Sequence, residues 1–347
     1  MKQLYHFLVL SLLSGALLAP VCSCASNNAG GNALSGKEDK VKYMSSVSGK
    51  AGDVLVVVGK DLWETEVGDA LRDVMACEYP FLPQREPYFN LYNTPHNAFN
   101  GAFMVHRNVV VVNIGAKFPE ARVICQKDLW AHPQVVVSIQ APSPAAAVEL
   151  IRDNTSLIQQ TIEQGERDRI ITNSKKFQDQ KIRNQIAKLA GGAPYFPKSF
   201  SIKRNVDDFI WVSHETTYVN QGLLVYTIPN PAVNRESLTK EFLLSECQEV
   251  LKNNVPGMRD GSYMTFSDMV EPEMEFINYQ DRVFAQMRGL WELENDYMGG
   301  PFVIHAFPNA LGDRLIVLHG FVYAPKYNKR SYLRNVESIL YSFDWKK

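Results

Sequence analysis

The sequence predicts an α+β fold of mainly antiparallel sheets with helices packed on them. Most runs of β-branched and aromatic residues follow one another with only short turns between them, which is typical of antiparallel strands. Few helical segments separate these runs, although a doubly wound parallel sheet needs a helix between most strands. A proline-free segment, residues 145–191, has helical periodicity and divides the strands into two groups.

The first group of strands predicts an N-terminal α+β lobe over residues 51–142. Its first β run, residues 53–59, is followed by an amphipathic helix over residues 61–75. Three further runs have the composition of strands, at residues 89–92, 105–114 and 134–140.

The segment between the two groups, residues 143–192, is expected to form a long helix or a helical hairpin. Two apolar stripes follow one another along it, and Gly165 lies between them as the expected position of a break. We interpret the charged residues from Glu163 to Lys188 as a solvated helix face rather than a nucleic-acid surface. Gly191 and Gly192 then end the helix.

The second group predicts a C-terminal α+β lobe over residues 193–347. It contains an amphipathic helix at residues 238–251 and a closing helix at residues 333–343. Five runs read as strands, at residues 222–228, 263–266, 282–293, 302–307 and 315–323. Both halves show the order strand, helix, several strands, helix, which favours two related lobes.

The first residues have the pattern of an export signal. Lys2 is followed by an apolar stretch, residues 7–19, that is too short to span a bilayer. Ser23 and Cys24 come soon after, and this start resembles the signal of bacterial lipoproteins. The resemblance implies a signal peptide over residues 1–23 and a lipid on Cys24; the alternative is an ordinary cleaved signal.

Residues 24–50 are rich in Ala, Ser, Asn and Gly and read as a flexible tether. Because acidic residues do not follow Cys24 directly, we expect an exported protein, lipid-anchored on the periplasmic face of the outer membrane.

Composition argues against several kinds of partner and cofactor. The chain has 36 Lys and Arg against 37 Asp and Glu, so no nucleic-acid partner is expected. The remaining cysteines do not have the spacing of metal ligands, and the standard catalytic motifs are missing. His305 and His319 could face each other across the last hairpin and bind a metal, but ordinary packing is favoured. We therefore expect no cofactor and no metal.

The segment of residues 288–302 carries the candidate ligand-binding residues. Alternation along a strand places Arg288, Glu292 and Glu294 on one face and Trp291 on the other, and a Gly-Gly turn follows. A set of polar and aromatic side chains here could grip a polar ligand: Arg288, Trp291, Glu292, Glu294, Asp296 and Tyr297. The simpler alternative is an amphipathic edge strand with Trp291 in the core.

Two segments resemble a known family. RGLWELENDYMGGPF (Arg288–Phe302) and GFVYAPKYNKRSYLRNVESILYSF (Gly320–Phe343), together with the lipoprotein-like start, resemble an uncharacterised family of Gram-negative lipoproteins described only as a domain of unknown function. This resemblance spans most of the mature chain and implies no activity. The C-terminal part is also similar, faintly, to the PsbP/Mog1-like α/β/α sandwich, which concerns the fold alone.

These observations favour a membrane-anchored periplasmic lipoprotein that is a non-enzymatic binding or envelope-assembly adaptor. Its expected partners are the membrane, through the N-terminal lipid, and an envelope protein or a small polar ligand. The alternative is a cell-envelope hydrolase that uses the acidic residues of the 288–302 segment, since paired carboxylates can cleave glycosidic bonds.

Overall fold

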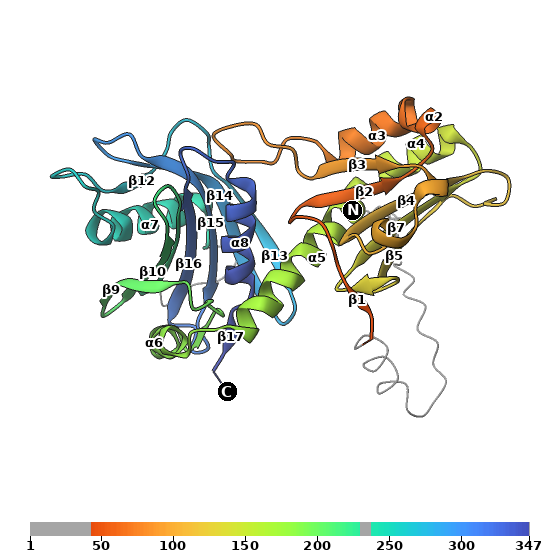
Figure 1. Cartoon of the computed structure of the whole chain (residues 1–347). Helices are drawn as coiled ribbons and strands as arrows, with labels where there is room; N and C mark the ends of the chain where they lie inside the picture. Colours follow the sequence, from red (N-terminus) through yellow and green to blue (C-terminus); the bar gives the residue numbers. More distant parts are fainter. Residues whose placement is uncertain (1–42, 230–236, 347) are drawn as a thin grey trace, which may run out of the picture. The chain divides into compact units, whose positions relative to one another are not determined.

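The computed structural model describes residues 43–229 and 237–346 (Figure 1). Within them the fold is α+β, as predicted, with helices on two large sheets and mostly antiparallel strand pairs. From Met44 on, the chain forms one compact unit. No described helix combines the length and the apolar character that crossing a membrane requires. The predicted signal peptide and Cys24 lie outside the described residues.

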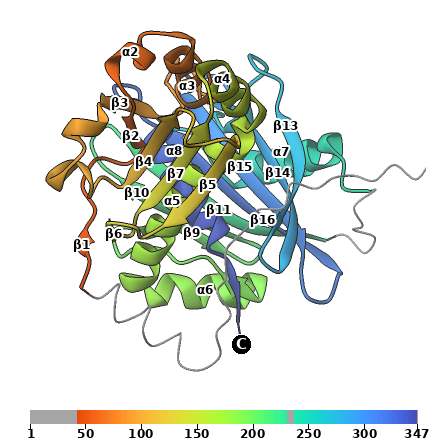
Figure 2. The same cartoon turned by 90° about the vertical axis from the view of Figure 1, so that its right-hand side faces the viewer.

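The first sheet has five strands in the order β3-β2-β4-β7-β5 (Figure 2). Their bounds are β2 (Asp53–Val57), β3 (Asn90–Thr94), β4 (Asn108–Ile114), β5 (Arg122–Lys127) and β7 (Val135–Ala141). All pairs are parallel except β5 with β7, which differs from the antiparallel arrangement expected. The physical reason is burial of the central strands on both faces, which suits valine-rich parallel strands.

Helices cover one face of this sheet. They are α2 (Lys60–Trp63), α3 (Glu66–Met75), α4 (Pro144–Asp153) and α5 (Thr155–Lys176). The core between them and the sheet contains Val56, Leu71, Val137 and Ile162. Smaller elements complete this part of the chain: β1 (Ser45–Ser46), η1 (His96–Ala98), η2 (Gly101–Phe103) and β6 (Ala131–His132).

The helical connection breaks elsewhere than predicted. Helix α5 runs through Gly165, and a Cβ there would lie 2.3 Å from Cγ2 of Val135. The glycine therefore lets the helix approach β7 closely instead of ending it. The breaks fall at Asn154 and between α5 and α6 (Gln180–Ala190), where the Asp179 side chain accepts hydrogen bonds from the first turn of α6.

The second sheet has eight strands, and all of its pairs are antiparallel. They are β9 (Ser201–Val206), β10 (Phe209–Glu215), β11 (Asn220–Pro229), β12 (Met264–Phe266), β13 (Glu273–Tyr279), β14 (Arg282–Leu293), β15 (Gly299–Pro308) and β16 (Arg314–Tyr323). A short pair closes the chain, β8 (Gly192–Ala193) with β17 (Asp344–Trp345). Because the two sheets differ in topology, the expectation of two related lobes is wrong.

Each face of the second sheet has its own core. Helix α8 (Arg330–Tyr341) and α6 cover one face, where Val303, Leu318 and Val336 are buried (Figure 1). Helix α7 (Lys240–Asn254) covers the other face, where Leu224 and Ile304 are buried. Alternation along the strands sends successive side chains into the two cores.

Buried ion pairs hold α5 against both sheets. The Arg334 guanidinium on α8, of which 1% is exposed, donates to both Glu163 carboxylate oxygens on α5, at 2.7 and 2.8 Å. On another side of α5, Glu166 is fully buried and accepts from Arg107 and Asn108, each at 2.7 Å. The interpretation of this charged run as a solvated face is therefore wrong at its start, because each buried carboxylate has its own cation.

A third buried carboxylate supports α8 from the first half of the chain. Glu86 accepts from the backbone N–H groups of Lys329, at 2.6 Å, and Arg330, at 3.1 Å. Orphan N–H groups at a helix start need such acceptors, and negative charge is favourable there. Residue 86 thus caps a helix that begins more than two hundred positions later.

Removing one partner of the Arg334–Glu163 pair should be costly. We expect Glu163→Gln to lower the free energy of unfolding by about 3 kcal/mol, because Arg334 then remains a buried charge without a carboxylate. Urea unfolding followed by tryptophan fluorescence measures this. The control is Glu64→Gln, which breaks the exposed Lys60–Glu64 pair and should cost less than about 1 kcal/mol. Equal costs for the two variants would contradict the assignment.

Candidate binding pocket

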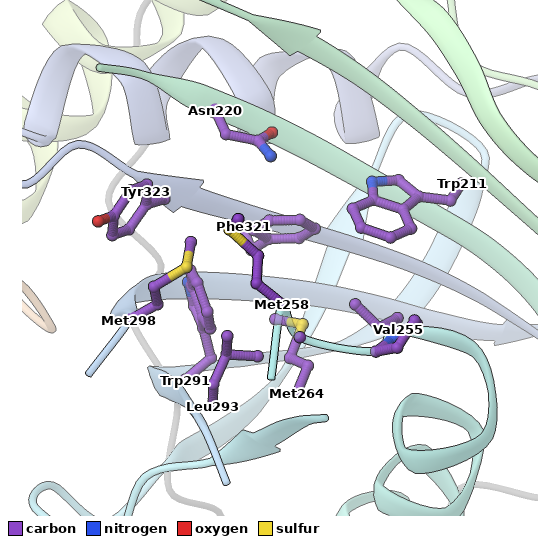
Figure 3. A pocket seen from close by; sticks show the side chains of 12 residues that line it. Trp211, Asn220, Val255, Met258, Met264, Trp291, Leu293, Met298, Phe321 and Tyr323 are labelled. Atoms are coloured by element: carbon purple, nitrogen blue, oxygen red, sulfur yellow. The ribbon is translucent and has the colours of Figure 1, made fainter. Parts of the chain in front are cut away.

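A pocket of about 190 Å³ lies on the α7 face of the second sheet, beside the chain that follows the end of α7 (Figure 3). Most of its lining is aromatic or sulfur-containing. The lining residues are Trp211, Asn220, Val255, Pro256, Gly257, Met258, Met264, Trp291, Leu293, Met298, Phe321 and Tyr323. They come from β10, β11, β12, β14, β16 and two connecting segments, so only the folded sheet brings them together.

An aromatic cluster forms the inner part of the pocket. The rings of Trp291 and Phe321 meet edge to face, with centroids 5.3 Å apart, and Trp211 lies 6.2 Å from Phe321 (Figure 3). Gly222 makes room for this arrangement, since a Cβ there would lie 2.1 Å from Cζ of Phe321. The indole N–H of Trp291 donates to the Val322 carbonyl at 3.3 Å, which fixes that ring. The cluster therefore presents ring faces and edges to an apolar ligand.

Two polar atoms of the lining are buried without a hydrogen-bond partner among the described residues. They are Nε1 of Trp211, a donor, and Oδ1 of Asn220, an acceptor. Buried polar atoms are rarely left unpaired, because each one loses its hydrogen bonds to water. Because neither atom is accessible to a water molecule, they add nothing to the surface that the pocket offers to a ligand.

The mouth of the pocket is held by contacts between two loops. Nε of Arg259 lies 3.6 Å from Oδ1 of Asp296, and the guanidinium lies 5.4 Å from the centre of the Tyr297 ring. The Tyr297 side chain is 94% exposed, and Met258, which lines the pocket, is 91% exposed. The pocket thus continues outward into exposed apolar side chains.

The structure does not gather the six predicted ligand-binding residues into one site. Trp291 lines the pocket, and Asp296 and Tyr297 lie in the loop at its mouth. Glu294 is exposed beside the lining residue Leu293. Glu292 is half-buried on β14 and lies outside the set of residues that line the pocket.

Arg288 lies on the opposite face of β14 from Trp291, as the alternation predicts. It forms an ion pair with Glu337 on α8 and also donates to Gln286, at 3.0 Å. Glu337 holds the pKa of the Arg288 guanidinium above its ordinary value, although burial acts in the opposite direction. Arg288 therefore stabilises the contact between β14 and α8 and does not line the pocket.

Sequence reasoning missed most of the lining. Trp211 and Asn220 lie in strands without a distinctive motif, and Met258 and Met298 come from irregular segments. One sequence feature could have indicated part of the lining. Phe321 and Tyr323 occupy alternate positions, and therefore one face, of the strand in the family-like segment.

The two histidines do not face each other. In the register of β15 and β16, His305 pairs with Leu318 and His319 with Ile304, so the two rings point to opposite faces. The suggested histidine pair is therefore wrong. The described residues contain no group of three or more side chains placed to hold a metal ion.

Family comparison covers most of the described chain. Residues 179–342 match the family "Domain of unknown function (DUF4837)", and residues 47–175 match "Domain of unknown function (DUF8532)". Each of these two matches covers less than half of the chain. The predicted likeness to such a family is confirmed, and the two matches meet at the end of α5. No curated protein matches the chain.

Similarity to solved structures is weak. The Ran-binding protein Mog1p of Saccharomyces cerevisiae is 11% identical, with 44% of this chain and 88% of Mog1p covered and a TM-score of 0.30. The lipid transfer and protein localization domain of human StarD13 (DLC2) is 11% identical, with 42% and 90% covered and a TM-score of 0.22. The structural likeness to Mog1p is thus present but weak, as predicted, and neither likeness gives information about function.

His319 makes stability depend on pH. Burial between Phe266 and Phe302 lowers its pKa to about 3, whereas an unfolded histidine titrates near 6.5. Below about pH 6.5 the unfolded chain therefore binds a proton that the folded chain does not, and stability falls. We expect the loss of unfolding free energy between pH 7 and pH 5 to be smaller in His319→Phe by about 2 kcal/mol.

Urea unfolding of the wild type and the variant at the two pH values measures this difference. His96→Gln, at an exposed position, is the control and should keep the wild-type dependence. An unchanged pH dependence in His319→Phe would contradict the neutral buried state of this histidine.

Proposed function

We propose that this protein is a non-enzymatic binding protein whose aromatic pocket holds an apolar group of its partner. The observation that carries the proposal is the pocket itself, which combines apolar rings and adaptable methionine side chains. An apolar group that enters it displaces water from the ring surfaces and gains dispersion contacts.

The pocket favours binding over the hydrolase alternative. A hydrolase needs titratable groups that face the bound substrate. The residues that line the pocket include no carboxylate and no histidine. Of the acidic residues in the 288–302 segment, Asp296 pairs with Arg259 and Glu294 points to solvent, which suits a rim around a binding site.

We also propose that the protein works next to a membrane. The export signal and Cys24 support a lipid anchor. The predicted end of the tether at residue 50 is wrong, because Ser45 and Ser46 form β1 and pair with β6. Residues 24–44 support a shorter tether with an end-to-end distance of roughly 22–27 Å. The partner is then an envelope protein within reach of that tether, and the protein acts on the periplasmic side as an adaptor or assembly factor.

A matched pair of exposed methionines tests the pocket. Met258 lines it, whereas Met269 is 83% exposed and lies outside the set of lining residues. We expect Met258→Asp to weaken binding of 5-fluoroindole by about tenfold or more, because burying the ligand would desolvate the new carboxylate. Fluorine NMR titration measures the affinity, and circular dichroism checks the fold.

The control variant Met269→Asp should bind the probe like the wild type. Equal affinities for all three proteins would contradict the assignment of the pocket as the binding site.

A further inference from the structure

Resting on the proposed function, we infer that the group held in the pocket is an aromatic side chain of a polypeptide, with basic residues beside it. Three features of the pocket lead to this ligand class: its size, its exposed apolar rim and the charge at its mouth.

The size of the pocket suits one ring. A cavity of roughly 150 Å³ binds benzene, and pockets for drug-sized molecules measure roughly 300–1,000 Å³. The pocket here, at about 190 Å³, lies just above the first value. It therefore accepts one aromatic side chain and not the body of a lipid.

The rim suits a protein interface. Met258 and Tyr297 extend the apolar surface beyond the pocket, and Arg259 follows Met258 and lies over the Tyr297 ring. Aromatic residues, methionine and arginine are enriched at interfaces, where contacts around a central anchor exclude water.

The charge at the mouth of the pocket determines which residues can flank the bound aromatic side chain. Asp260, two positions after the lining residue Met258, and Glu294, directly after the lining residue Leu293, are exposed, and neither forms an ion pair within the described chain. Arg259 already neutralises Asp296. The mouth is therefore negative, which complements lysine or arginine on either side of the aromatic residue.

Competition between short peptides and 5-fluoroindole tests this inference. We expect acetyl-Lys-Phe-Lys-amide to displace the probe at a concentration about tenfold lower than acetyl-Glu-Phe-Glu-amide, with the preference shrinking at about 0.5 M salt. The double variant Asp260→Asn/Glu294→Gln should bind the probe normally and lose the preference. Decanoate serves as the acyl-chain competitor and should be weaker than the lysine peptide.

The outcomes separate the two proposals. If the probe binds but the two peptides compete equally, or decanoate competes best, the ligand class inferred here is wrong and the binding function stands. If the wild-type protein does not bind the probe at all, the proposed function itself fails.

Discussion

Helix α5 carries two buried carboxylates, and each pairs with a cation from a different part of the chain. Glu163 pairs with Arg334 on α8, and Glu166 pairs with Arg107, which precedes β4, and with Arg169 of α5 itself. A buried charge without its partner costs several kcal/mol, so the Glu163 carboxylate is stable in its buried position only when α5 contacts α8. Glu86 adds the acceptor that the start of α8 requires. The two matched domains are therefore linked by charge pairing as well as by the chain.

The contact between α8 and the second sheet explains why the pocket lies on the α7 face. Helix α8 occupies one face of the second sheet, where Glu337 pairs with Arg288. Three positions further along β14, Trp291 points to the other face and lines the pocket. One strand thus supports the contact with α8 through one set of side chains and the pocket through the alternate set. Because α7 ends at Asn254, the chain that follows it, rather than the helix, forms that side of the pocket.

The sequence predicts the long central strands and the helices of the second half well, because their apolar residues recur with period two or 3.6. Strands β5, β9 and β13 escaped prediction since they carry charged, exposed side chains at sheet edges. The valine runs of the first sheet are typical of parallel strands buried on both faces, but the small number of helices between the strands favoured an antiparallel sheet, so the parallel arrangement was missed. Periodicity also treats Glu163 as solvent-exposed, because an ion pair with Arg334 leaves no local signal. The pocket combines residues as far apart in the sequence as Trp211 and Phe321, so no short sequence motif indicates it.

The most direct test of the account is a crystal structure of the protein soaked with an aromatic probe such as 5-fluoroindole. The account predicts that the ring lies in the pocket against Trp211, Trp291 and Phe321. A ring bound at another surface, while this pocket stays empty at saturating probe, would contradict the central claim.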